Sequence, residues 1–376
     1  MTIETRVVTG PEALRSHASP LDDLHEATDA PLTARRPWLQ AWAEAHPDRR
    51  ILAVLAGSGE GRLEGAALLA AHRPGRLLDV TAMGHGVSDY MRLPARTPEA
   101  AEALAEAVVE ALDAEGRPWQ LHLDRLPAGD PVARRIAASV RWSRFLPGEG
   151  APRIVFGPDR SPAATMGRKA WKSDRNGWNR LARAEAAIAV ACTRDPERIA
   201  RLLPELRRIR DLRDREMLGA SSLEDPEARR FWEGVILALA REGRAEVLAL
   251  ELDGALAAYT LSFWDGPVCR VWDGRFDPVL AQYGPGRLSD MMVLRRALAR
   301  PEVAEFDWMQ GMEDYKVRMS TRIEEVESLL AWSSWSVRAL VGTRPLLRAA
   351  LTRVKDRSPA LDRAWRSVKR RRAARR

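Results

Sequence analysis

The chain has 376 residues, of which 45% are hydrophobic and 30% charged, an ordinary globular composition that predicts a real core and two or three domains. It has no run of about 18 uncharged apolar residues, and its N-terminus does not resemble a signal peptide, so we expect neither a transmembrane helix nor secretion. The two cysteines, Cys192 and Cys269, are too few for a disulfide framework or a zinc site. This favours a reducing cytoplasm and an enzyme without a metal.

The net charge of +8 is concentrated near the end of the chain. Residues 335–376 contain 14 Lys or Arg and two Asp, a net charge of +12, so the preceding residues carry −4. Within this basic tail, residues 345–355 and 359–372 have the spacing of amphipathic helices. Such a tail is typical of contact with an anionic partner, either nucleic acid or a membrane surface. A solvated terminus explains it equally well.

Residues 1–158 are predicted to form a first α/β unit. Helices are expected at 33–46, 97–115 and 130–138, and strands at 51–56, 63–71, 77–82, 120–124 and twice within 140–156. In the first helix, Trp38 and Trp42 are four residues apart and therefore share one face. The sequence Thr97-Pro98-Glu99 supplies a cap, a proline and an acid to the start of the second helix.

The pattern restarts in residues 159–334, which are predicted to form a second α/β unit. Helices are expected at 163–184, 196–217 and 226–242, and strands at 245–252, 256–264, 268–273 and 326–333. Asp253-Gly254 and Asp265-Gly266 mark tight hairpin turns between the first three of these strands. Between the third and the last strand lie a glycine turn, a helix and a short apolar strand.

Both units have a similar order of helices and strands, which predicts the architecture of the whole chain. The fold class we expect is α/β (α+β), with two tandem units that each contain a mixed, largely antiparallel sheet flanked by helices. The expected domains are residues 1–158 and 159–334, followed by a basic amphipathic helical tail at 335–376.

The glycine turn Gly284-Pro285-Gly286-Arg287 is a candidate anion site. Glycines at the start of a helix let backbone N–H groups approach an anion, and the positive end of the helix dipole adds to the attraction. Arg287 could pair with a phosphate, so the turn suits a pyrophosphate such as that of coenzyme A. The spacing fits neither a Walker loop nor a dinucleotide fingerprint. A plain helix-entry turn is the alternative.

A second candidate cluster follows the short apolar strand that carries Phe306 and Trp308. Its polar members are Asp307, Gln310, Glu313, Asp314, Tyr315 and Lys316. Asp307 could accept a proton from an amine, Tyr315 could donate one to a leaving group, and Lys316 could hold a carboxylate or phosphate. All six histidines lie before residue 123, so chemistry at this cluster cannot use a histidine base. The alternative is a surface loop of solvated charges.

Two further sets of residues could line a cleft that the glycine turn and this polar cluster would form. Arg168, Lys172 and Arg175 have helical spacing that places them on one side of the helix at 163–184, where they could hold an anionic donor or acceptor. A solvated helix face is the alternative. Asp273 and Asp277 follow the strand at 268–273 and could also line the cleft, or they could form turns, as Asp-Gly and Asp-Pro often do.

Four segments carry a resemblance to a known family: Leu-Glu-Leu-Asp-Gly-Ala-Leu-Ala-Ala-Tyr (250–259), Arg-Phe-Asp-Pro (275–278), Tyr-Gly-Pro-Gly-Arg-Leu (283–288) and Phe-Asp-Trp-Met-Gln-Gly-Met-Glu-Asp-Tyr-Lys (306–316). Together they resemble the GNAT-fold acetyltransferases of the CelD type, which are close to the Fem peptidyltransferases. Asp89-Tyr90 in the first half is also similar to a loop of the family. Gly284 stands where serine is common in that family.

The resemblance implies tandem GNAT-like domains that form an acyltransferase. The donor co-substrate would be an acyl-CoA, acetyl-CoA first of all, or an aminoacyl-tRNA as in the Fem branch. The acceptor would be the amine of a small molecule or peptide, which attacks the donor directly without a covalent enzyme intermediate.

The site residues that we expect fall into three groups. The catalytic group is Asp307, Gln310, Tyr315 and Lys316, the donor-binding group is Tyr283, Gly284, Gly286, Arg287 and Leu288, and the substrate-binding group is Asp89, Tyr90, Lys172, Arg175, Asp273 and Asp277. A third hypothesis is a non-catalytic GNAT-like module that binds a partner or an anionic membrane through the basic tail. The expected location is the cytoplasm, with peripheral membrane contact as the variant that this tail suggests.

Overall fold

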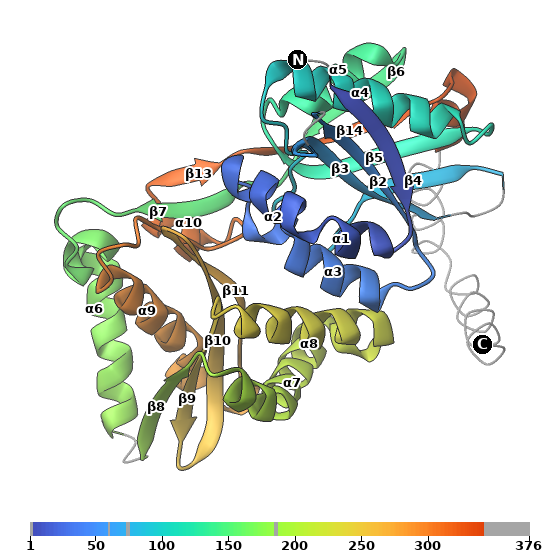
Figure 1. The fold of residues 1–376 in the computed structure, drawn as a ribbon. Helices are drawn as coiled ribbons and strands as arrows, with labels where there is room; N and C mark the ends of the chain where they lie inside the picture. The colour runs from blue at the N-terminus through green and yellow to red at the C-terminus, as the bar shows by residue number, and fades with distance from the viewer. Residues whose placement is uncertain (1–2, 59–60, 73–75, 184–186, 342–376) are drawn as a thin grey trace, which may run out of the picture.

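The computed structural model describes residues 3–58, 61–72, 76–183 and 187–341. This part of the chain forms two seven-stranded sheets, one above the other in Figure 1, with helices between and around them. The predicted fold class of two tandem mixed sheets flanked by helices is confirmed. No helix in these ranges is long and apolar enough to cross a membrane.

The first sheet has the strand order β1-β2-β3-β4-β5-β14-β6 and is antiparallel except where β4 runs beside β5. Its strands are β1 (Glu4–Thr9), β2 (Arg50–Gly57), β3 (Leu63–His72), β4 (Leu78–Ala82), β5 (Trp119–Pro127), β6 (Trp142–Pro147) and β14 (Val326–Trp332). A parallel pair needs a crossover, which α4 (Pro98–Asp113) provides, and the Thr97 hydroxyl caps this helix as predicted.

Helices cover both faces of the first sheet, so its central strands are almost continuously apolar. One face of β2, with Ile51 and Leu55, packs on α1 (Glu12–Ser16), α2 (Ala18–Ala27) and α3 (Arg36–Ala45). The opposite face, with Leu52 and Val54, packs on α4 and α5 (Pro131–Ser139).

The second sheet has the order β13-β7-β12-β11-β10-β9-β8, again with one parallel pair, β11 and β12. Its strands are β7 (Ala151–Val155), β8 (Ile188–Thr193), β9 (Ala245–Leu252), β10 (Ala255–Asp265), β11 (Val268–Phe276), β12 (Glu305–Asp307) and β13 (Arg322–Glu324). Its helices are α6 (Pro162–Arg183), α7 (Pro196–Leu218), α8 (Pro226–Arg241), α9 (Pro285–Leu298) and α10 (Asp314–Met319), and short 3₁₀ turns lie at η1 (Leu32–Ala34), η2 (Ser222–Glu224) and η3 (Pro278–Tyr283).

The two halves of the chain exchange strands. β14 follows the second unit in sequence but lies between β5 and β6 of the first sheet, and β7 lies between β12 and β13 of the second sheet. The links β6–β7 and β13–β14 pass so closely that a Cβ on Gly148 would lie 2.7 Å from Val326, and one on Gly150 the same distance from Ile323. Because each sheet takes a strand from the other half, a single boundary near residue 158 stays a prediction.

A shared core holds the two sheets together. α3 packs against α8, and the fully buried Trp38 meets Phe231, Phe263 and Trp272 with ring centroids 5.2 to 6.0 Å apart. Trp42 is buried on the same face of α3, as its spacing predicts. A large apolar interface of this kind fixes the relative position of the two units.

Local signals located most helices and strands correctly, with five omissions and one correction. The strands β1, β8 and β13 and the helices α1 and α2 were not predicted. Tyr315 and Lys316 were expected at a strand end, but β12 stops at Asp307 and both residues lie on α10. The amphipathic helices expected at 345–355 and 359–372 lie outside the described residues.

Candidate active site

The two parallel strands of the second sheet separate soon after they begin. β11 and β12 pair over three positions that end at Arg270 and Asp307. β11 then continues along β10 as far as Phe276, whereas the chain after Asp307 turns away through Met309 and Gly311, whose φ angles are +59° and +116°. An opening therefore forms beside the carboxyl end of β11, a position at which α/β sheets commonly bind ligands.

The predicted glycine turn forms the first turn of α9 beside this opening. Gly284 is the N-cap and has φ +65° and ψ 41°, a left-handed conformation that favours glycine. A Cβ on Gly286 would lie 2.7 Å from the ring of Phe276, so glycine lets the helix approach the end of β11. The exposed Arg287 follows, without an ion pair in the part of the chain that the structure describes.

These elements enclose a cavity of about 460 Å³. Its walls are the end of α7, the end of β11, the first turns of α9 and the start of α10. Its lining includes Gly274, Gly286, Arg287, Asp290, Glu313 and Tyr315. The structure thus brings the predicted donor-binding residues Gly286 and Arg287 together with the predicted catalytic residue Tyr315.

Asp290 is a candidate functional residue that the sequence analysis missed. Its half-buried carboxylate lines the cavity and accepts a 2.8 Å hydrogen bond from the Thr260 hydroxyl. Gly274 allows this position, since a Cβ there would lie 3.2 Å from Asp290 Oδ1. Burial raises the pKa of Asp290 to about 6, although the Thr260 hydrogen bond and the charge of Lys316 oppose the rise. A carboxyl group that titrates near neutral pH in a cavity is suited to accept a proton.

A short chain of hydroxyl groups connects Asp290 with the start of α9. Thr260 Oγ1 lies 2.5 Å from Ser289 Oγ, which donates at 3.1 Å to the carbonyl oxygen of Gly286. When Asp290 is protonated, three protons serve the three contacts in series. When it is ionised, only the two hydroxyl protons remain, so one contact lacks a proton. In the ionised state the Thr260 hydroxyl donates to Asp290, which is why this contact opposes the rise in the pKa.

Tyr315 lies across the cavity from the start of α9. Its ring packs edge-on against the buried Trp308, with centroids 5.7 Å apart. Burial, followed by the negative charges of Asp290 and Glu313, raises the pKa of Tyr315 well above its ordinary value. Its hydroxyl group therefore stays protonated and can act as a hydrogen-bond donor.

Asp307 is not part of this cavity lining. It is fully buried, where it pairs with Arg270 at 2.5 Å and accepts hydrogen bonds from the Tyr90 hydroxyl and the Met309 N–H, each at 2.8 Å. These contacts join β12 to the first half of the chain through Tyr90. The geometry favours a structural position for this carboxylate, and its catalytic role stays a prediction.

Gln310, Lys316 and Asp89 meet at the boundary between the two halves. Gln310 Nε2 donates to the backbone carbonyl of Asp89 at 2.9 Å. Lys316 Nζ pairs with Glu313 at 2.9 Å and donates to the carbonyl of Gln310 at 3.4 Å. Burial raises the pKa of Asp89 to about 6, although Arg125 opposes the rise. Through Glu313 this group reaches the edge of the cavity.

The two other predicted aspartates are held in local structure. Asp273 is buried and contacts Trp232, Tyr259, Arg210 and Arg275 at 2.6 to 3.1 Å. Burial alone would raise the pKa of Asp273, but the two arginines hold it at about 2. Asp277 instead caps η3.

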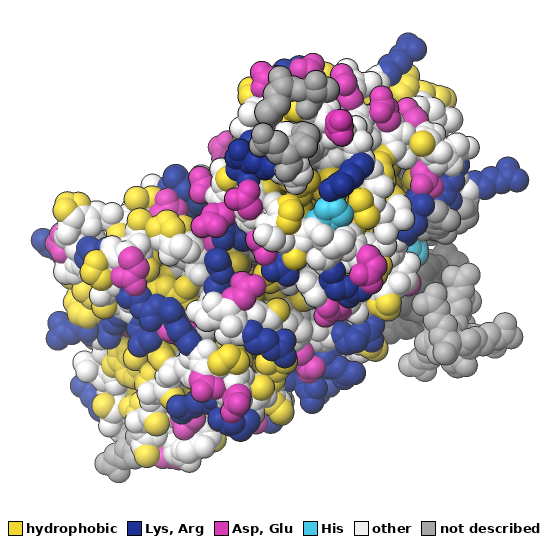
Figure 2. Space-filling model, in the orientation of Figure 1, with side chains coloured by type: hydrophobic (Ala, Val, Ile, Leu, Met, Phe, Trp, Pro, Cys, Tyr) yellow, Lys and Arg dark blue, Asp and Glu magenta, His cyan; other side chains and the backbone are white. Residues whose placement is uncertain are grey.

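The remaining predicted residues divide between the core and the surface. Leu288 is buried in an apolar cluster against which the half-buried Tyr283 packs. Lys172 and Arg175 lie on the exposed side of α6, and neither has an ion pair among the residues described. Figure 2 shows Lys and Arg side chains gathered over the region where Figure 1 places α6 and α9.

Comparison with known protein families also singles out the second half of the chain. Residues 168–317 match the acetyltransferase (GNAT) domain family. These residues include α9, the cavity-lining Asp290 and the predicted cluster up to Lys316. No curated protein sequence matches the chain.

Several solved structures share the fold over most of the chain. FemX has a TM-score of 0.57 at 12% identity, and the match covers 87% of this chain and 96% of FemX. The C-terminal domain of an Agrobacterium fabrum protein assigned as a lysylphosphatidylglycerol synthetase has a TM-score of 0.52 at 13% identity, and the match covers 88% of this chain and 97% of that domain. L-PGS from Bacillus licheniformis has a TM-score of 0.51 at 14% identity, and the match covers 86% of this chain and 95% of L-PGS. The domain match and the shared fold support an acyltransferase.

Proposed function

We propose that this protein is an N-acyltransferase of the CelD type, which moves an acyl group from acyl-CoA, acetyl-CoA first of all, to the amine of a small molecule or peptide. The observation that carries this proposal is the cavity in which the first turn of α9, Asp290 and Tyr315 meet. A donor anchor, a proton acceptor and a hydrogen-bond donor are the three parts that such a transfer needs.

The first turn of α9 suits the pyrophosphate of the donor. Its first N–H groups have no partner within the helix. They combine with the helix dipole and with Arg287, which has no ion pair among the residues described, to attract an anion. The last residues of β11 pair with β10 on one side and extend beyond β12 on the other. That edge suits the two amides of a pantetheine arm, in the way that an extended peptide adds to a sheet.

The cavity residues can then perform a direct transfer. The amine attacks the thioester carbonyl, a C–N bond forms and the C–S bond breaks. Asp290 accepts the proton that the nitrogen loses. A thiol has an ordinary pKa of about 8.5, below the raised value of Tyr315, so the tyrosine hydroxyl would stabilise the leaving thiolate by a hydrogen bond rather than protonate it fully. The proton on Asp290 finally returns through solvent to the thiolate or the buffer.

A second donor is favoured by one specific observation. Arg168, Lys172 and Arg175 are exposed on α6, and no ion pair to them occurs among the described residues. An uncompensated cationic helix beside the donor anchor suits the phosphate backbone of an aminoacyl-tRNA, whose binding rests on such contacts.

A donor screen distinguishes these two functions. The protein would be incubated with a pool of amines and either acetyl-CoA, longer acyl-CoAs or charged tRNA, and product amide and free thiol would be measured. We expect amine-dependent release of CoA and thermal stabilisation by CoA. Arg287→Gln should weaken CoA binding about tenfold, whereas Arg318→Gln, an exposed arginine of α10 outside the cavity, should not. Acyl transfer from charged tRNA alone would refute the CoA donor and support the alternative.

A further inference from the structure

A second cavity lies between the two sheets, apart from the candidate active site. Its volume is about 200 Å³, far more than the 10–15 Å³ or so that a single water needs. Both halves of the chain contribute to its walls. Its charged and hydrogen-bonding lining residues are Tyr90, Arg92, Arg125 and Arg153 from the first half of the chain, and Arg270 and Glu324 from the second; Arg153 lies on β7 and therefore in the second sheet.

Arg153 is a largely buried cation whose contacts with carboxylates are all long. Its Nε is buried and has no hydrogen-bond partner among the residues described. Its carboxylate neighbours Glu305, Asp307 and Glu324 lie at 3.4, 3.5 and 3.6 Å, whereas a good charge-assisted hydrogen bond is about 2.7–2.9 Å long. A buried guanidinium with five donors is normally bonded more closely than this.

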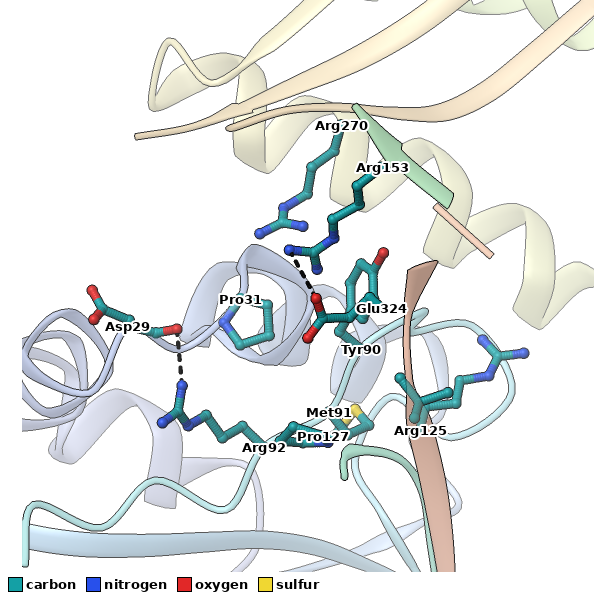
Figure 3. Close-up of a pocket in the computed structure, with 11 residues that line it drawn as sticks. Asp29, Pro31, Tyr90, Met91, Arg92, Arg125, Pro127, Arg153, Arg270 and Glu324 are labelled. Atoms are coloured by element: carbon teal, nitrogen blue, oxygen red, sulfur yellow. Dashed lines mark hydrogen bonds and ion pairs between the residues drawn. The ribbon is translucent and has the colours of Figure 1, made fainter. Parts of the chain in front are cut away.

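Arg92 lies on the other side of the cavity from Arg153 in Figure 3, with its guanidinium directed toward Asp29. It is half-buried, and its Nη1 donates a 3.3 Å hydrogen bond to the backbone carbonyl of Asp29. No ion pair to Arg92 occurs in the part of the chain that the structure describes. Its positive charge is therefore not held in a direct ion pair in this part of the chain, although it acts at a longer distance on the buried Asp130, whose pKa it lowers against the effect of burial.

The other two arginines of the cavity wall have close carboxylate partners. Arg270 pairs with Asp265 at 2.9 Å and with Asp307 at 2.5 Å. Arg125 Nη1 donates to Asp89 at 3.1 Å and to the carbonyl of Ser88 at 2.6 Å. Among the residues described, Arg92 and Arg153 are thus the arginines of this wall that lack a carboxylate within 3.1 Å.

The carboxylate of Glu324 lies against Arg153 on the cavity wall, as Figure 3 shows. It has a closer partner elsewhere, since Arg322 Nη2 lies 3.1 Å from its Oε2 while Arg153 is 3.6 Å away. Its side chain is 31% exposed, so it is free to turn toward Arg322. The oxyanion of a bound ligand could take the place of Glu324 beside Arg153.

We propose that this cavity binds the phosphate or carboxylate group of a small molecule, held between Arg92 and Arg153. Planar guanidinium forks are well matched to either oxyanion. Pro31, Pro127 and Val326 supply apolar wall beside the two arginines, which suits a short carbon body attached to the anion. Because Arg92 lies in the segment between β4 and α4 of the first unit and Arg153 lies on β7 in the second sheet, the ligand also stabilises the contact between the two units.

The proposal is tested by calorimetric titration of the full-length protein with inorganic phosphate, glycerol phosphate and acetate. Ionic strength is held constant with chloride, because general salt effects on stability do not saturate. We expect saturable binding of at least one of these probes. Tighter binding of glycerol phosphate than of phosphate would identify an organic phosphate as the natural source, and binding of acetate alone would identify a carboxylate. The absence of saturable binding by all three overturns the proposal.

Three variants locate the site. Arg92→Gln should weaken binding about tenfold or more, because a charge-assisted contact is lost. Glu324→Gln should tighten binding severalfold, because it removes the competing carboxylate, an effect that a purely structural role would not produce. Arg96→Gln is the matched control, since Arg96 lies in the same segment, pairs with Asp23 and does not line this cavity. Equal affinities in wild type and Arg92→Gln, or unchanged binding in Glu324→Gln, refute this site. The readout needs no acyl transfer, so it is independent of the proposed function.

Discussion

Replacing Asp290 by Asn should remove acyl transfer and at the same time stabilise the protein at neutral pH. Burial raises the pKa of this carboxyl from 3.8 to about 6 in the folded protein. Between these two values the folded state binds more protons than the unfolded chain, so the free energy of unfolding falls as the pH rises through this window. The difference between the two pKa values corresponds to about 3 kcal/mol of unfolding free energy. The folded protein has lost this stability above pH 6 and retains it below pH 4.

The amide of Asn is neutral like the protonated carboxyl and keeps the contact with the Thr260 hydroxyl, because it has both a donor and an acceptor. The variant should therefore gain up to about 3 kcal/mol of unfolding free energy at pH 8 and almost nothing at pH 4. Loss of a positioned proton acceptor should lower kcat/KM by about 10² to 10⁴. In the wild type, kcat/KM should rise with pH through about 6 and then level off.

Urea unfolding at pH 4, 6 and 8 measures the first effect, and initial rates of amide formation between pH 5 and 9 measure the second. Asp314→Asn is a suitable control, because Asp314 is an exposed acid of α10 outside the cavity. A variant that is equally stabilised or destabilised at all three pH values would contradict the assigned burial of charge. Undiminished turnover in Asp290→Asn would remove Asp290 from the mechanism.

Three further substitutions test the frame around the site. Gly286→Ala should destabilise the fold by about 1–3 kcal/mol and weaken CoA binding, because its Cβ would lie 2.7 Å from Phe276. Thermal melts with and without CoA measure both effects. An unchanged melting temperature would contradict this close approach. Trp38→Ala should cost about 3–5 kcal/mol in urea unfolding, because this fully buried ring joins the two halves, and a loss below 1 kcal/mol would mean that the halves are held elsewhere. Asp273→Asn should cost about 2 kcal/mol at pH 7, and this cost should disappear as the pH falls from 4 toward 2, because Arg210 and its neighbours hold the pKa of Asp273 near 2; a cost that does not depend on pH would exclude the ion pairs as its cause.

Much of the fold was readable from local signals. The Thr97 cap, the spacing of Trp38 and Trp42, and the Asp253-Gly254 turn each act within a few residues, and the structure bears out all three. At that turn both residues have positive φ, +52° and +77°, which is why the pair Asp-Gly predicted it. The glycines of the α9 turn were also identified from the sequence as a turn that opens a helix. The structure gives the reason for each: Gly284 has a left-handed conformation, and Gly286 lies too close to Phe276 for a side chain.

The candidate site could be predicted only in part, because burial and partner choice are not local. Asp290 resembles any polar residue in the first turns of a helix, and its raised pKa arises from contact with β10 and β11. Asp307 was the most obvious acid of its segment, yet Arg270 and Tyr90 occupy it, and Tyr90 lies 217 residues away in sequence. No pattern around Asp307 indicates that partner.

The sequence by itself determined which segments become helices and strands, and that two similar sheets follow one another. Those outcomes depend on capping, turn conformation and hydrophobic periodicity, which act over a few residues. Only the tertiary structure decided that β7 and β14 change places between the sheets, which acids are held in ion pairs, and that Asp290 shares a cavity with Tyr315. The reason is that pairing between distant strands and the burial of a charge depend on every surface that closes over them.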